Sequence, residues 1–169
     1  RAIVLDKAGQ PWVATKDGPR VLVRAAWVKP DGANAVGSSH SICIDGSGTV
    51  WVGATSGLWM ISGGKVQPVP SFTQVPIGAV SAKGNLVVAA GPDGVFWTKG
   101  GYWAKVPGRT MQNVRTVYIA NDGHIWVGTS SGLYILDPTG KKPVVRLGRQ
   151  DVLLSSNIHD IRALKNGDI

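Results

Sequence analysis

Basic side chains recur at one position of a repeated pattern in this chain of 169 residues. Eight residues before the glycines at 9, 48, 84, 123 and 167 stand Arg1, His40, Pro76, Arg115 and His159. Two residues further on stand Ile3, Ile42, Gly78, Val117 and Ile161. If each of these residues begins a strand, and if these strands surround a central channel, the basic side chains gather at the mouth of that channel. There they would attract anionic groups. A solvated polar strand start is the other interpretation.

The segments that join one repeat to the next carry further polar side chains. They are Ser38-Ser39-His40, Ser71-Phe72-Thr73-Gln74, Arg109-Thr110-Met111-Gln112-Asn113 and Ser155-Ser156-Asn157. Connecting loops on a rigid scaffold are a common place for function. We therefore predict a ligand site at the channel mouth that uses His40, Arg115, His159, Arg109, Asn113 and Gln74. The same loops would also suit a peptide, or no ligand at all.

Composition and spacing exclude several kinds of chemistry. The chain has one Cys, no Glu and three His without His-x-His or His-x3-His spacing, so we predict no metal site and no cofactor. No Gly-x-Ser-x-Gly and no phosphate loop occurs, and Cys43 lies in an apolar segment, so we predict no catalytic residue. The net charge is +8, but the cations are scattered, which argues against specific nucleic-acid binding.

The glycines mark a repeat of about forty residues, with spacings of 39, 36, 39 and 44. Each repeat begins with an apolar strand: 2–6, 41–45, 77–82, 115–120 and 159–164. A turn, a second strand with a Val/Ile-Trp-Val pattern, a Ser-Gly or Asp-Gly turn, a third strand and a weaker fourth strand follow. No window shows a sustained helical period. The pattern predicts an all-β propeller with four-stranded blades, four of them plus a stub.

Three Trp residues share the second-strand position and should fill the space between blades: Trp12, Trp51 and Trp126. Four others lie outside this register and suit either packing or a surface for stacking sugars: Trp27, Trp59, Trp97 and Trp103. By this alignment the third repeat has Val87 in place of Trp.

The segments 122–134 (DGHIWVGTSSGLY) and 45–58 (DGSGTVWVGATSGL) resemble the two-component regulator propeller repeat. The resemblance extends over the whole chain and implies a seven-bladed propeller. It also implies a non-enzymatic sensor segment in the extracytoplasmic (periplasmic) part of a membrane-anchored bacterial signalling protein. The alternatives are an interaction scaffold and, less well supported, a lyase, since antibiotic-cleaving lyases also use Trp-Gly-rich propellers.

The two ends of the chain duplicate the innermost strand and do not complete one blade. We therefore expect residues 1–169 to be one propeller segment of a larger chain, with its repeats centred on Gly9, Gly48, Gly84, Gly123 and Gly167. No apolar run is long enough to span a membrane. The expected partners are a small anionic or carbohydrate ligand or a protein, and the open blade faces suggest self-association.

Overall fold

Four antiparallel sheets, each of four strands, make up the part of the chain that the structure describes. The structure is a computed structural model that describes residues 2–99, 101–107, 111, 113–139, 141, 144–151 and 153–164. Two single 3-10 turns are the helical elements in these ranges, η1 (Ala33–Ala35) and η2 (Pro70–Phe72). The all-β fold with four-stranded blades is therefore confirmed.

Each sheet contains four strands that follow one another in the sequence. Blade 1 is β1 (Ile3–Leu5), β2 (Pro11–Thr15), β3 (Gly18–Val23) and β4 (Ala26–Val28). Blade 2 is β5 (Ser39–Ile44), β6 (Val50–Ala54), β7 (Gly57–Ser62) and β8 (Lys65–Pro68). Blade 3 is β9 (Ala79–Lys83), β10 (Leu86–Gly91), β11 (Gly94–Lys99) and β12 (Trp103–Lys105). Blade 4 is β13 (Val114–Ile119), β14 (Ile125–Thr129), β15 (Gly132–Leu136) and β16 (Val145–Leu147).

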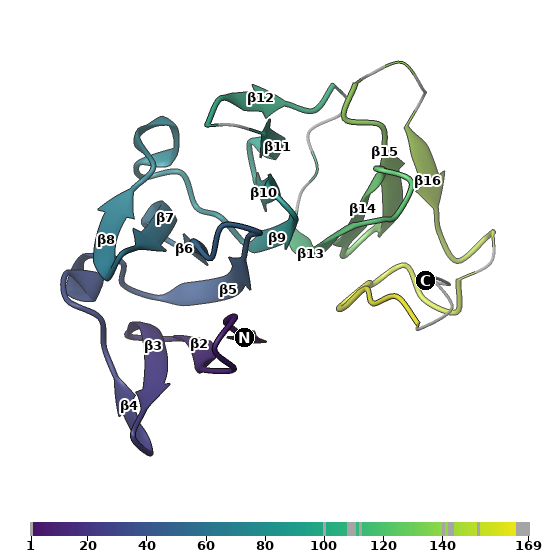
Figure 1. The fold of residues 1–169 in the computed structure, drawn as a ribbon. Helices are drawn as coiled ribbons and strands as arrows, with labels where there is room; N and C mark the ends of the chain where they lie inside the picture. Colours follow the sequence, from purple (N-terminus) through teal and green to yellow (C-terminus); the bar gives the residue numbers. More distant parts are fainter. Residues whose placement is uncertain are drawn as a thin grey trace.

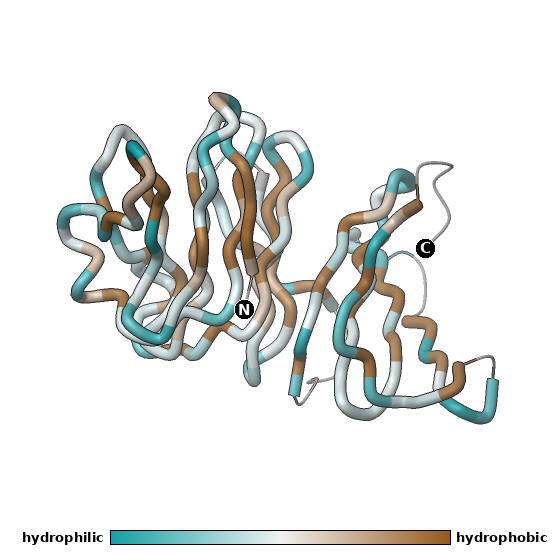
Figure 2. The backbone as a smooth tube through the Cα atoms, turned by 90° about the horizontal axis from the view of Figure 1, so that it is seen from below, coloured by the Kyte–Doolittle hydropathy of each residue, from teal (hydrophilic) through white to brown (hydrophobic). Residues whose placement is uncertain are grey.

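The blades form an arc, with the first strand of each blade toward the centre and the fourth at the periphery (Figure 1). Apolar stretches follow the strands and polar residues gather at the turns (Figure 2). Every second residue of a strand points to the same face of its sheet. Blades 2 and 3 have apolar residues on both faces and bury both faces against the neighbouring blades.

Three clusters of buried side chains lie between successive blades. One joins blades 1 and 2 through Ala14, Ile42 and Val52, and one joins blades 2 and 3 through Leu58, Ile77 and Ala89. The third joins blades 3 and 4 and contains Val88, Ile125 and Leu136. Trp12 and Trp51 pack against the first two clusters, as the shared repeat position predicts. Trp59, Trp97 and Trp103 also pack against a cluster, whereas Trp27 is 44% exposed.

The glycine of the Trp-Val-Gly pattern makes room for the chain that crosses to the next blade. A Cβ atom on Gly53 would lie 2.9 Å from Ile77 Cγ2, and one on Gly128 would lie 2.6 Å from Ile158 Cγ2. Ile77 N donates to Ala54 O and Ile158 N to Thr129 O, both at 2.9 Å. The repeat glycine therefore fixes how closely one blade follows another.

The first turn of blades 1 and 2 is closed by an aspartate. Asp45 Oδ1 accepts hydrogen bonds from Ser47 N and Thr49 N, and Trp51 Nε1 donates to Asp45 Oδ2 at 2.8 Å. Asp6 makes the equivalent bond with Trp12 Nε1 at 3.2 Å. These contacts combine the turn and the inter-blade Trp in one hydrogen-bonded unit, which we call the Asp–Trp clamp.

Hydrogen bonds also connect the turns of successive blades. Lys7 Nζ donates to Gly46 O at 2.6 Å, and Gly46 N donates to Gly84 O at 2.6 Å. Lys83 Nζ donates to Ala120 O at 3.0 Å and to Asn121 Oδ1 at 2.6 Å. The four first turns are therefore joined in a continuous series along one end of the arc.

Blade 3 differs from the sequence alignment by a shift in register. Its first hairpin has only Gly84 and Asn85 between paired residues, whereas blade 2 has the five residues 45–49. Ala79 pairs with Ala90 where Ser41 pairs with Gly53, so Val88 and not Val87 takes the Trp position. The alignment on Gly84 was wrong at this point because Gly84 is the first residue of its two-residue turn, whereas Gly48 is the fourth of five. The Trp position therefore lies four residues after Gly84 and three after Gly48.

Residues 159–164 do not form the predicted strand. They follow Ile158 along the centre of the arc, where the other blades place their first strands (Figure 1). A strand is defined by its hydrogen-bonded partner, and residues 165–169, where a second strand would begin, lie outside the described residues, as does Gly167. No helix in the described ranges has the length and apolar character needed to cross a membrane.

Candidate functional site

His40 and Arg115 are the extra residues of two equivalent β-bulges. In blade 2 the pairing with β6 passes from Ser39 to Ser41, and in blade 4 the pairing with β14 passes from Val114 to Thr116. A bulge leaves one residue unpaired and redirects its side chain. Both His40 and Arg115 are exposed, whereas Ser39 beside His40 is completely buried.

His159 lies at the corresponding position of the fifth repeat, directly after Ile158 and its hydrogen bond to blade 4. His40, Arg115 and His159 line one cavity of about 370 Å³ together with Asp160 and Arg162. We call this cavity the channel mouth. The structure therefore brings three of the predicted ligand residues together from segments that are distant in the sequence.

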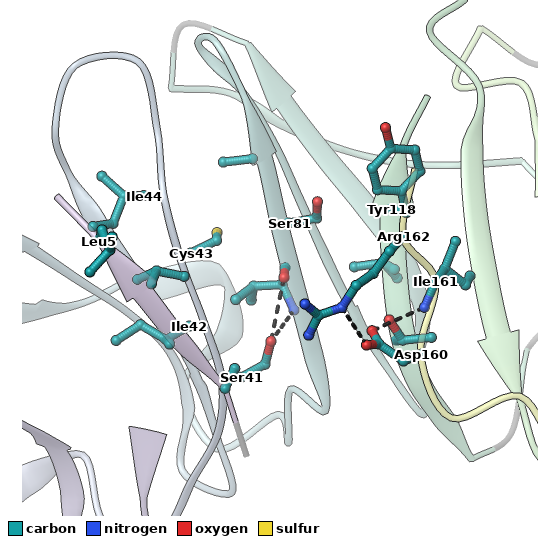
Figure 3. Close-up of a pocket in the computed structure, with 16 residues that line it drawn as sticks. Leu5, Ser41, Ile42, Cys43, Ile44, Ser81, Tyr118, Asp160, Ile161 and Arg162 are labelled. Carbon is teal, nitrogen blue, oxygen red and sulfur yellow. Dashed lines mark hydrogen bonds and ion pairs between the residues drawn. The ribbon is translucent and has the colours of Figure 1, made fainter. Parts of the chain in front are cut away.

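A second cavity, of about 410 Å³, adjoins the mouth along the innermost strands and shares Ser41, Thr116, Asp160 and Arg162 with it. Figure 3 shows Arg162 extending into this cavity between Ser41 and Asp160. Arg162 Nε lies 2.7 Å from Asp160 Oδ2, and the Arg162 side chain is 85% exposed. Because this side chain is exposed, its guanidinium can contact a ligand in the cavity without first being released from a buried position.

Ser41 holds two innermost strands together inside this cavity. Its Oγ accepts a hydrogen bond from Val80 N at 3.0 Å and lies 3.4 Å from Val80 O, a link drawn in Figure 3. The sequence pattern did not point to Ser41, Asp160 and Arg162, because they lie next to the two repeat positions that were compared and not at them. The polar residues His159, Asp160 and Arg162 were the available signal, because all three line the channel mouth.

Two other predicted ligand residues, Gln74 and Asn113, are not brought to the mouth. Gln74 and Asn113 are exposed, have positive φ values of 63° and 54°, and are absent from the lining of both cavities. Gln74 N donates to Ser56 O at 2.9 Å, which indicates a role in the turn. Arg109 lies outside the described residues, as does Arg1.

The repeat column needs one further correction. The first-strand position of blade 3 is occupied by Gly78 and not by Pro76, because Gly78 precedes Ala79 as His40 precedes Ser41. A Cβ atom on Gly78 would lie 3.0 Å from Val114 O, so this position is crowded by the neighbouring strand. Blade 3 therefore contributes no cation to the mouth.

Two other titratable groups of the sequence have local roles. Burial raises the pKa of the Cys43 thiol far above its ordinary value, with a smaller contribution from the Asp45 charge, which keeps the thiol protonated. His124 Nδ1 lies 2.8 Å from Asp122 Oδ2 in the first turn of blade 4. The backbone N–H of His124, its side chain and its charge lower the pKa of Asp122.

Within the part of the chain that the structure describes, no three His, Cys or Asp side chains gather in a way that would hold a metal ion. The chemistry available at the mouth is therefore that of two guanidinium groups, two imidazoles, one carboxylate and the hydroxyls of Ser41 and Thr116. These groups recognise anions and hydroxyl groups through hydrogen bonds and charge.

Comparisons with known proteins agree with this fold. A family model described as two component regulator propeller matches residues 109–131. A solved structure of the extracellular domain of a hybrid two component system, BT4673 from B. thetaiotaomicron, superposes with a TM-score of 0.81 at 15% identity. That alignment covers 99% of this chain and 25% of the other. The corresponding domain of BT3049 from the same organism gives a TM-score of 0.76 at 19% identity, again over 99% and 25% of the two chains.

An enzyme of similar fold also matches: virginiamycin B lyase from Staphylococcus aureus, with a TM-score of 0.63 at 10% identity, over 85% of this chain and 53% of the lyase. No curated protein sequence gives a significant match. The chain spans about a quarter of the length of the two extracellular domains, so the likeness describes one part of them. Residues 109–131 carry a two component regulator propeller repeat, and the chain has the propeller fold of the extracellular domains of hybrid two component systems.

Proposed function

We propose that this chain is a non-enzymatic segment of an extracytoplasmic sensor propeller in a bacterial signalling protein, and that its channel mouth binds a small anionic ligand. The observation that carries the proposal is the convergence of His40, Arg115 and His159 on one cavity. Arg162 adds a second guanidinium, and among the described residues Asp160 is the one acidic residue in the lining. The extracellular location of the similar domains supports a periplasmic site.

The mouth lies where the innermost strands of all four blades meet the fifth repeat. A ligand bound there contacts β5, β13 and residues 159–162 at once, so it favours one arrangement of the blades over others. A ligand shifts an equilibrium only by its differential affinity for the two states. A membrane-proximal module attached to the propeller would respond to that shift.

Calorimetric titration with D-glucuronate, with D-glucose as its neutral counterpart, tests this function. Glucuronate should bind and glucose should bind at least tenfold more weakly, because the cations recognise the carboxylate. Arg115→Gln and His159→Ala should each weaken glucuronate binding several-fold. Arg24→Gln, at an exposed turn of blade 1, is the matched control and should bind as the native chain does. Equal binding by Arg115→Gln, His159→Ala and the native chain would contradict the assignment.

Self-association is a second candidate, supported by the outward face of blade 1. Ile3 and Leu5 are 63% and 64% exposed, although the equivalent Ile42 of blade 2 is 3% exposed beneath blade 1. We infer that this face packs against the same face of a second copy. Light scattering should detect a dimer that Leu5→Lys dissociates, and a native chain that stays monomeric at high concentration would exclude it.

A further inference from the structure

A separate cavity of about 440 Å³ opens between blades 2 and 3, at the end of the blades opposite the channel mouth. Its rim is formed by Ser47 and Asn85 in the first turns of the two blades, and its wall by Trp51, Val87 and Thr98. The cavity shares no residue with the channel mouth. Its size falls in the range of small-ligand sites, which are mostly apolar with a few polar groups.

The cavity exists because blade 3 has small side chains where other blades have large ones. Thr98 pairs with Val87 as Ile61 pairs with Val50 in blade 2 and Leu136 pairs with Ile125 in blade 4. Ile61 and Leu136 are 3% and 1% exposed, and fill the corresponding space between blades. Ala82, which pairs with Val87 and lines the neighbouring cavity along the innermost strands, is likewise smaller than Ile44 in blade 2 and Ile119 in blade 4.

The hydroxyl of Thr98 has no partner. Thr98 is 4% exposed, and its Oγ1 is one of two buried side-chain polar atoms in the described residues without a hydrogen bond. Thr129, another buried threonine, donates from Oγ1 to Gly132 O at 2.9 Å. A buried polar group without a hydrogen-bond partner lowers the stability of the fold by roughly 1–3 kcal/mol. A hydroxyl at this otherwise apolar position therefore indicates that a molecule in the cavity supplies the missing partner.

The remaining groups of the cavity restrict what that partner can be. Both carboxylate oxygens of Asp45 already accept hydrogen bonds, and its charge repels an anion. Trp51 is fixed by Asp45 and by an edge-to-face contact with Trp103, with 5.8 Å between ring centroids. The indole is therefore a rigid apolar wall, which favours a flat, uncharged ring.

We propose that this cavity binds a small neutral ring compound through an oxygen or nitrogen that pairs with Thr98 Oγ1. The ring lies against Trp51 and Val87, and the polar atom of the ligand reaches the hydroxyl. Asn85 and Ser47 at the rim provide further hydrogen-bonding groups for a substituted ring. This site is independent of the anion site at the channel mouth.

Titration of the native chain with phenol, followed by NMR, tests the proposal. Saturable shifts are expected at the amides of Val87 and Thr98 and at the Trp51 indole N–H, and benzoate, the anionic ring of similar size, should cause none. Thr98→Val removes the hydroxyl at nearly constant shape and should weaken phenol binding about twofold to tenfold, which corresponds to one hydrogen bond.

Thr98→Ile introduces the side chain that blade 2 has at this position. It should abolish phenol binding and raise the melting temperature by filling the cavity. Thr55→Val, in the exposed turn between β6 and β7, is the control and should leave phenol binding unchanged. If the native chain shows no saturable shifts, or if Thr98→Ile binds phenol as well as the native chain, the cavity holds only solvent and the proposal is wrong.

Discussion

The two ends of the blades use their polar residues differently. At the turn end, Asp6, Asp45, Lys7 and Lys83 are all committed to hydrogen bonds within or between blades. At the mouth, in the described part of the chain, His40, Arg115 and His159 are exposed and form no side-chain hydrogen bond or ion pair. The turn end holds the fold together, whereas these three side chains remain available to the ligand that we propose for the mouth.

Within the turn end, the first turns of blades 2 and 4 also differ in their polar side chains. Blades 2 and 4 have matching backbone hydrogen bonds in their first turns, such as Gly48 N to Asp45 O at 3.0 Å and Gly123 N to Ala120 O at 3.2 Å. Blade 4 has Ala120 in the position of Asp45, and its Trp126 Nε1 is buried without a hydrogen-bond partner. Turn shape is therefore set by the backbone, and the Asp–Trp clamp adds stability to it.

Loss of the clamp in blade 2 should have the largest effect. Asp45→Ala leaves Trp51 Nε1 and two turn N–H groups without an acceptor, and should lower the free energy of unfolding by about 2 kcal/mol. Urea denaturation measures this loss. Asp93→Ala, in an exposed turn, is the control. If Asp45→Ala also weakened glucuronate binding, the conclusion that the turn end and the mouth have separate roles would be wrong.

Two matched Trp substitutions should separate packing from hydrogen bonding. Trp51→Phe removes a hydrogen bond to Asp45, whereas Trp126→Phe removes an N–H that has no partner. The loss of stability should be larger for Trp51→Phe by about 1 kcal/mol. Denaturation midpoints of the two variants provide the comparison, and equal losses would show that the clamp contributes nothing measurable.

Acid should weaken the turn end selectively. The N–H of Gln10 and the Trp12 indole lower the pKa of Asp6, and hydrogen bonds from Ser47, Trp51 and Thr49 outweigh burial to lower that of Asp45. A lowered pKa means that this stability is complete above the ordinary value of 3.8 and declines as pH falls through the folded-state pKa.

Urea midpoints between pH 7 and pH 2 measure that decline. Asp45→Asn should flatten the part of the curve below about pH 4, because its amide does not titrate in this range. An unchanged curve would assign the acid sensitivity to other groups.

A charge added at the mouth should have the smallest effect. His40→Lys places a permanent cation on the bulge of β5 and should raise glucuronate affinity about twofold, since exposed charges interact weakly in water. The urea midpoint should not change. Calorimetry at low and high salt checks the electrostatic origin, because salt screens such an interaction.

Much of this fold follows from sequence periodicity. The recurring glycine and the Trp-Val-Gly pattern predict the strands and their order, since alternation and turn residues are local signals. The third repeat was misaligned because a two-residue hairpin at Gly84 replaces a five-residue turn, and turn length is not visible from the strand pattern. Val88 occupies the Trp position of this blade, but its side chain lacks the size by which Trp marks that position in the other blades.

The candidate site was predictable only in part. His40 and Arg115 share a repeat position, so equal spacing placed them together. Gln74 and Asn113 were chosen for residue type, and their positive φ values serve the loop instead. Thr98 gave no sequence signal, because its meaning depends on the burial of Ile61 and Leu136 at the same position in other blades.

The structure of the chain in complex with D-glucuronate tests the central claim most directly. The account predicts the carboxylate at the channel mouth, within hydrogen-bonding distance of Arg115 or Arg162 and near His159. Glucuronate bound at the turn end or on the outward face of blade 1, with an empty mouth, would contradict it.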